Sequence, residues 1–186
     1  MDAHRVGALF RATQPLYIVV ELLVAAVAAP YDLVTSTISE LGVAAVSPEH
    51  AVINGAFVLF GVTLTLGAVL GERPSRTARV LWVIAGLSSV ATGLAPLDTA
   101  PVAHFVVSTP VFLAQPVALL LTGLAVRSRT AAALGVVSIV ASAVFLLGLA
   151  PELGGLLERL ALWPGYLVLG VLGVRTLARA SAASAG

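Results

Sequence analysis

Residues 51–95 read AVINGAFVLFGVTLTLGAVL, then GERPSRTAR, then VLWVIAGLSSVATGLA. Two long apolar runs are joined here by a short polar segment that carries Arg73, Arg76 and Arg79. Each run is close to the length at which a helix crosses about 30 Å of hydrocarbon. Because arginine is retained on the cytoplasmic side of a membrane, the stretch predicts two transmembrane helices whose connection faces the cytosol.

The same pattern extends in both directions along the chain. Four further apolar segments flank the hairpin, and together they predict an all-α, polytopic transmembrane bundle of six helices. Nine of the ten positive charges, all arginines, then fall on one side, and only Arg159 falls on the other. We therefore expect a multi-pass protein of the cell (cytoplasmic) membrane with both termini cytoplasmic, and the short connections predict one domain over residues 1–186. The six segments are 13–29, 51–70, 80–95, 102–126, 131–150 and 160–177.

Composition excludes several other classes of protein. Hydrophobic residues make up 59% of the chain and charged residues 10%, and the mean hydropathy is +1.06. A soluble domain of this size needs more polar surface. The net charge of +1 gives no reason to expect a nucleic-acid partner, since the arginines sit at helix ends where they meet anionic lipid headgroups. The chain has no cysteine, which excludes disulfides, thiolate nucleophiles and iron–sulfur clusters.

An acid lies inside the first segment. Glu21 is about eight residues from either end, which puts it roughly 12 Å from each membrane surface at 1.5 Å per residue. A charge at that depth costs about 3 kcal/mol. Gln14, Tyr17 and Glu21 share one helix face, which we expect to meet hydroxyls in the bundle interior, from Ser88, Ser89, Thr92, Ser138 or Ser142. Two interpretations stay open, an acid that bonds two helices together and a ligand or proton site.

A second group of polar residues is predicted at the non-cytoplasmic ends of the helices. Folding brings these residues to one membrane level, where they form a candidate outer-rim pocket. Pro110 and Pro116 predict a kink in the fourth helix, and kinks beside polar residues often line cavities. In the alternative interpretation His104 is only a hydrogen-bonding residue at the rim and Glu158 with Arg159 is an anchored ion pair. The candidate pocket residues are Ser39, Glu40, Asn54, Asp98, His104, Glu158 and Arg159.

At these residues the chain resembles the membrane proteins grouped as domain-of-unknown-function family 998. The resemblance rests on residues 37–42 (TISELG) after the first segment, Asn54 with Gly55, and Pro96 with Asp98. His104 and the pair Glu158 and Arg159 follow in the same order. The resemblance implies a six-span integral membrane protein whose polar residues cluster on one side, and it implies no established activity.

Three functions stay open on the sequence. The one we favour is an outer-leaflet pocket that binds or moves a lipid headgroup or small amphiphile. The second is a membrane-embedded hydrolase or transferase that uses an outward acid with His104, with or without a divalent metal. The third is a structural subunit of a membrane complex.

The expected partners are membrane lipid and a small amphiphilic ligand. The cofactor is unknown from the sequence, and no metal site is predicted, because no metal-ligand, phosphate-binding or dinucleotide motif is present. Glycines permit close helix contacts within one bundle or between copies, so the sequence allows an oligomer.

Overall fold

The computed structural model describes residues 2–28, 30–71 and 75–183, and within them every regular element is helical. Six spans are long and apolar enough to cross a membrane, the first formed by α1 with α2 and the last by η2 with α7. The predicted all-α, six-span architecture is confirmed, and the chain is a multi-pass membrane protein. The elements are α1 (Ala3–Ala12), α2 (Leu16–Val27), η1 (Ser39–Gly42), α3 (His50–Leu70), α4 (Arg76–Leu94), α5 (Pro101–Ala125), α6 (Arg129–Leu146), η2 (Pro151–Leu153) and α7 (Gly154–Ala183).

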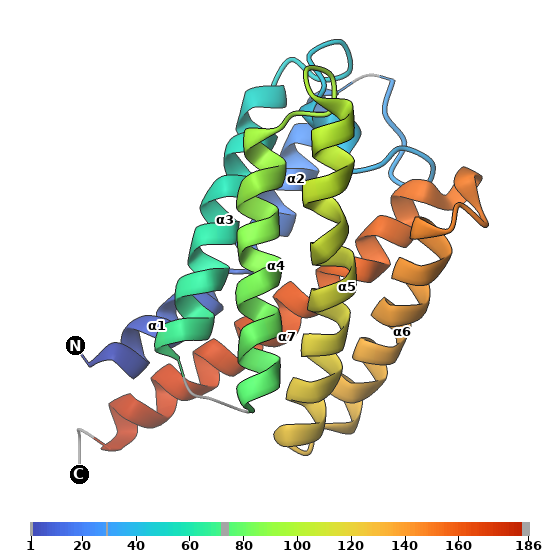
Figure 1. Cartoon of the computed structure of the whole chain (residues 1–186). Coiled ribbons are helices and arrows are strands. Elements are labelled where there is room, and N and C mark those ends of the chain that lie inside the picture. Colours follow the sequence, from blue (N-terminus) through green and yellow to red (C-terminus); the bar gives the residue numbers. More distant parts are fainter. Residues whose placement is uncertain (1, 29, 72–74, 184–186) are drawn as a thin grey trace.

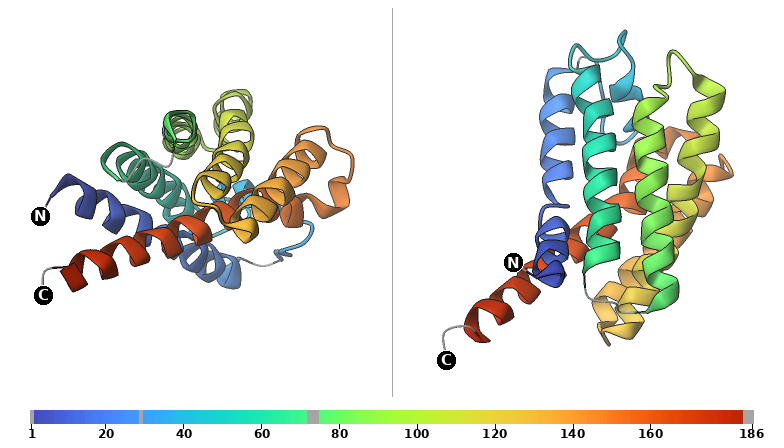
Figure 2. Two further views of the ribbon diagram at one scale, coloured as in Figure 1. Left: turned by 90° about the horizontal axis from the view of Figure 1, so that it is seen from below. Right: turned by 60° about the vertical axis from the view of Figure 1, so that its left-hand side comes forward.

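Helices that follow one another in the sequence pack side by side, from α3 to α7, and α1 packs against both α3 and α7. α7 crosses the bundle at a steep tilt, and the two ends of the chain lie at the same end of the molecule (Figures 1 and 2). We call this the arginine end, and the opposite end, which carries residues 30–49, the loop end. Which compartment each end faces stays a prediction. Arg73 and Ala29, used to predict the topology and the first segment, lie outside the described residues.

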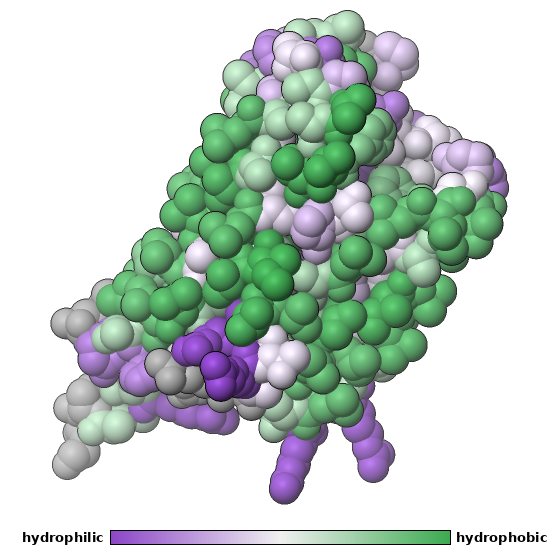
Figure 3. Space-filling model, in the orientation of Figure 1, coloured by the Kyte–Doolittle hydropathy of each residue, from purple (hydrophilic) through white to green (hydrophobic). Residues whose placement is uncertain are grey.

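The lateral surface is apolar. Figure 3 shows hydrophobic side chains over the middle of the face in view, with polar ones gathered toward the two ends. Large aliphatic residues stand well out of the bundle, as Val102 (76% exposed) and Leu94 (72% exposed) illustrate. Such a band is solvated by lipid rather than by water.

The first span differs from the predicted segment 13–29. It consists of two helices, and the second begins only at Leu16. Pro15 has no amide proton to donate, and it packs so closely on α7 that a Cβ on Gly170 would lie 2.3 Å from its Cγ. The preceding helix α1 is capped by Asp2, whose side chain accepts from the Arg5 amide at 2.8 Å.

The last span also differs from the prediction, because α7 begins at Gly154 and not near residue 160. Glu158 and Arg159 therefore lie inside a helix and not in the connection before it. α7 also runs through Pro164, whose missing amide leaves the carbonyl of Leu160 without its helical donor. The hydroxyl of Ser138 on α6 donates to that carbonyl at 3.0 Å, so the proline does not leave a bare carbonyl in the bundle.

Candidate functional site

The connection between α2 and α3 covers the loop end of the bundle (Figure 1). We call residues 31–49 the capping loop. Its one regular element is η1. Leu41 within η1 and Ile38, the residue immediately before it, are both completely buried. These two side chains anchor the loop on the apolar core. The polar residues singled out in the sequence then bind its backbone.

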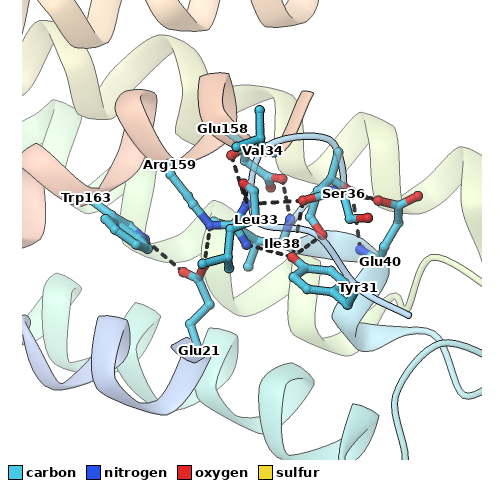
Figure 4. A network of polar contacts seen from close by, with 12 residues as sticks. Glu21, Tyr31, Leu33, Val34, Ser36, Ile38, Glu40, Glu158, Arg159 and Trp163 are labelled. Atoms are coloured by element: carbon cyan, nitrogen blue, oxygen red, sulfur yellow. Dashed lines mark hydrogen bonds and ion pairs between the residues drawn. The ribbon is translucent and has the colours of Figure 1, made fainter. Parts of the chain in front are cut away.

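Glu21 of α2 and Arg159 of α7 form a buried ion pair. Arg159 Nε lies 2.9 Å from Glu21 Oε1, and the two side chains are 5% and 0% exposed. Trp163 donates its indole N–H to the other carboxylate oxygen of Glu21 at 2.8 Å. Figure 4 shows the three side chains meeting between α2 and α7. The expected bonds from Glu21 to interior hydroxyls are therefore not what the structure shows, since an arginine and a tryptophan occupy both carboxylate oxygens.

The rest of the Arg159 guanidinium binds the capping loop. Nη1 donates to the carbonyls of Leu33 at 2.7 Å and Ser36 at 3.1 Å, and Nη2 donates to the Tyr31 hydroxyl at 2.6 Å. Tyr31 in turn donates to the carbonyl of Thr37 at 2.8 Å. Burial raises the pKa of Tyr31, so its phenol keeps the proton that it donates. One cation thus ties the acid of α2 to two loop carbonyls and a tyrosine.

Glu158 binds the same loop independently of its neighbour. Its Oε2 accepts from the backbone amide of Ile38 at 2.6 Å, and the side chain is within the bundle (2% exposed). The predicted alternative of a Glu158 and Arg159 ion pair is wrong, because the partner of Arg159 is Glu21. Glu40 lies within the loop and accepts from the amide of Thr37 at 2.5 Å, which stabilises the turn that precedes η1.

Two other predicted site residues bind the far part of the capping loop. Asn54 of α3 donates to the carbonyl of Gly42 at 2.9 Å. Asp98, between α4 and α5, accepts from the amide of Ala44 at 3.1 Å. Both therefore hold the loop, and neither is bonded to the group around Arg159.

Ser39 and His104 meet at the start of η1. The Ser39 hydroxyl lies 3.0 Å from His104 Nε2, and His104 Nδ1 lies 2.8 Å from the carbonyl of Ala95. Because a carbonyl only accepts, we assign the ring proton to Nδ1, and Nε2 is then the acceptor for the Ser39 hydroxyl. A serine bonded to a histidine that a third group orients is the arrangement of an activated nucleophile.

A small chamber of about 20 Å³ lies beneath the loop, and its lining is mostly apolar with a few hydroxyl groups and one acid. This volume is enough for a single water molecule. The Tyr17 hydroxyl is buried next to this region and has no hydrogen-bond partner among the described residues; its ring centre is 4.9 Å from that of Tyr166. Within the same described part of the chain, no three histidine or acidic side chains gather as metal ligands would. The chamber is lined by Ser39, Phe57, Ser89, Thr92, Ser108, Val111, Phe112, Glu158, Leu162 and Tyr166.

The predicted group therefore converges on one loop, but not around one open void. Of the predicted residues only Ser39 and Glu158 line the chamber, and His104 contacts Ser39 from outside the lining. Sequence reasoning missed Tyr31 and Trp163, which complete the network around the ion pair (Figure 4). The placement of Trp163 one helical turn after Arg159 was a signal that this tryptophan shares the face of the arginine.

A family model described as "Protein of unknown function (DUF998)" matches residues 12–175. The match includes every predicted site residue, and it confirms the resemblance read from the sequence. Neither the curated proteins nor the solved structures compared with the chain gave a match.

Proposed function

The chain belongs to the DUF998 family of proteins of unknown function, and since that description assigns no activity, we propose a function from the geometry. The protein binds the headgroup of a membrane lipid or small amphiphile in the chamber under the capping loop, which acts as a lid. The observation that carries this proposal is the convergence of side chains from three separate parts of the bundle (α3, α7 and the connection between α4 and α5) on the backbone of this one loop, above a small chamber whose lining includes Ser39 and Glu158.

Buried ions support a binding role. A bundle that serves only as scaffold packs as well or better with apolar residues in place of a buried ion pair, and ionisable groups inside membrane proteins commonly mark ligand or ion pathways. Arg159 and Glu158 are held by loop carbonyls and a loop amide. A headgroup offers oxygens and N–H groups of the same kind, so it replaces the loop as their partner when the loop moves aside.

The size of the chamber requires the lid to move. About 20 Å³ holds a water but no headgroup, since ligand pockets are typically about 300 to 1,000 Å³. By the positive-inside argument, the chamber opens toward the non-cytoplasmic leaflet of the cytoplasmic membrane. The ligand accordingly enters from that leaflet.

A disulfide that fixes the loop tests this proposal. A Cβ on Gly154 would lie 3.5 Å from Thr37 Cγ2, so the two positions are in contact and are chosen for a cysteine pair, and the chain has no cysteine of its own. The Thr37→Cys, Gly154→Cys protein is reconstituted in nanodiscs of phosphatidylethanolamine and phosphatidylglycerol, oxidised or reduced, and the lipids it retains are counted by native mass spectrometry.

We expect the oxidised double variant to retain fewer lipids than the reduced one, and the Thr37→Cys single variant to be unaffected by oxidation. An identical lipid complement in the two redox states contradicts the proposal. The polar contacts would then serve only to hold the loop, as expected for a structural subunit.

The contact between Ser39 and His104 favours a second candidate, an ester hydrolase. In this reaction His104 Nε2 takes the Ser39 hydroxyl proton as Oγ attacks a lipid ester carbonyl, and the ester C–O bond breaks as the alcohol leaves with that proton. Water then hydrolyses the acyl-serine and restores the serine hydroxyl, while the Ala95 carbonyl orients the ring. The sequence interpretation expected an outward acid to act with His104. In the structure the side chain in contact with His104 Nε2 is Ser39. A fluorophosphonate probe labels Ser39 if the candidate is right; an unlabelled wild-type protein, or equal labelling of Ser39→Ala, removes it.

A further inference from the structure

We infer that a second cavity, at the arginine end of the bundle, binds one anionic phospholipid from the leaflet on that side. The cavity has a volume of about 720 Å³ and lies between the last turns of α7 and the connection of α5 to α6, with α1 and α4 contributing side chains. Figure 2 shows α7 crossing this end of the bundle beside α1. It is independent of the chamber under the capping loop and shares no residue with it.

The polar part of this cavity is cationic. Arg11, Arg175 and Arg179 line it, and no carboxylate does so among the described residues. Arg175 and Arg179 are four residues apart on α7, so they project from the same face of the helix. Both are exposed, and neither forms an ion pair within the described part of the chain. Arg11 is positioned by a bond from its Nε to the carbonyl of Gly67 at 3.0 Å.

Hydroxyl groups lie among these cations. Ser128, Thr130 and Thr176 line the same cavity, and each adds a donor of the kind that binds phosphate oxygens. Three guanidinium groups with several hydroxyls and no acid match a phosphate-bearing headgroup in charge and in hydrogen bonding. The predicted orientation also fits, because basic side chains at the cytoplasmic ends of helices attract anionic lipid.

The remainder of the cavity is apolar, which selects a lipid over a soluble anion. Leu134 of α6 and five apolar residues of α7 line it, and these side chains offer contact to an acyl chain. Trp82 lies at the wall, buried and bonded through its indole N–H to Thr122 at 3.1 Å. A small phosphate ester would leave this apolar wall uncovered, whereas a phospholipid fills both parts. The five α7 residues are Leu167, Val168, Leu169, Val171 and Leu172.

The chain supplies a matched pair of variants. Arg175→Gln with Arg179→Gln removes two charges from the cavity. Arg127→Gln with Arg129→Gln removes two charges from the same end of the bundle, at positions that do not line it. Binding of dioleoyl phosphatidylglycerol and dioleoyl phosphatidylcholine to each purified protein is measured by native mass spectrometry.

We expect the wild-type protein and the Arg127, Arg129 variant to bind one phosphatidylglycerol about tenfold or more tightly than phosphatidylcholine. The Arg175, Arg179 variant loses most of this preference. Equal binding of the two lipids by the wild-type protein overturns the inference, and so does an equal loss of preference in both double variants.

Tryptophan fluorescence locates the lipid. The chain has two tryptophans, so Trp163→Phe leaves Trp82 at the cavity wall as the sole fluorophore. Brominated phosphatidylglycerol quenches Trp82 more strongly than brominated phosphatidylcholine does, and the Arg175, Arg179 substitutions remove the difference. Quenching that is the same for both lipids contradicts the assignment. Relief of quenching by glycerol phosphate identifies a soluble phosphate ester as the ligand and overturns the lipid assignment.

Discussion

Arg159 Nε lies 2.9 Å from Glu21 Oε1, and this contact joins the first span of the bundle to the last. The same guanidinium donates to the carbonyls of Leu33 and Ser36 in the capping loop. The ion pair therefore closes the bundle and fixes the loop above it. Removing either charge exposes the other to an apolar interior without a counter-ion.

We predict that Glu21→Gln destabilises the protein strongly. The amide keeps an acceptor for Trp163 but leaves the buried Arg159 cation without its anion, and breaking a buried pair in this way costs about 3–5 kcal/mol. Unfolding in detergent, followed by tryptophan fluorescence, measures the loss. As a control, Glu21→Leu and Arg159→Leu are made singly and together. The double variant is expected to lose less free energy of unfolding than the two single variants summed; strictly additive losses would mean that the two charges do not interact.

Ser138→Ala is expected to cost about 1–3 kcal/mol of unfolding free energy, because it leaves the carbonyl of Leu160 buried without a donor. A second substitution tests the cause. Pro164→Ala restores a backbone amide four residues after Leu160, so the same Ser138→Ala change costs less in that background. An undiminished cost in the Pro164→Ala protein would show that the serine acts through something other than the carbonyl. Thermal unfolding of the four proteins in one detergent provides the comparison.

The six spans could be predicted from the sequence because the bilayer sets both the length of each apolar segment and the side on which its arginines lie. These constraints apply to each segment separately and do not depend on contacts between helices. The break at Pro15 and the continuity of α7 through Pro164 were not readable. Both depend on a contact with a distant helix, through Gly170 in one case and Ser138 in the other. A proline in the sequence shows where a helix lacks a backbone N–H donor. Whether another group donates to the carbonyl that is left depends on the neighbouring helix.

The sequence predicted which residues form the candidate site, but not which of them bind one another. Polar residues at one membrane level were expected to meet, and Ser39 with His104 and Glu158 with the capping loop do so. The partner of Arg159 was missed, because a long side chain inside a helix reaches across the bundle to Glu21 and not along the chain to its neighbour. Local sequence spacing carries no information about that choice.

Acid is expected to loosen the beginning of the capping loop through Asp32. Bonds from the amides of Thr35 and Val34, each 2.9 Å, lower the pKa of this exposed carboxyl below its usual 3.8. A lowered pKa contributes stability above the unfolded value, so the turn keeps its full stability above about pH 3.8 and loses it as the pH falls through the lower folded-state pKa. The amide shifts of Val34 and Thr35, followed by NMR in detergent, report the transition. Asp32→Asn removes the titrating group, and an acid transition that persists unchanged in this variant assigns the effect to another residue.

Fusions at three positions test the orientation on which the proposed leaflet assignments depend. Arg175 and Arg179 lie in the last turns of α7 at the arginine end, opposite the capping loop. Since arginine is retained in the cytosol, green fluorescent protein joined to either terminus is expected to fluoresce, and alkaline phosphatase inserted after Glu49 is expected to be active. The same phosphatase fused after the C-terminus provides the matched control and should be inactive. Active phosphatase at the C-terminus would reverse the membrane orientation, placing the capping loop in the cytosol and the arginine-lined cavity in the opposite leaflet, where anionic lipid attraction no longer explains the arginine distribution.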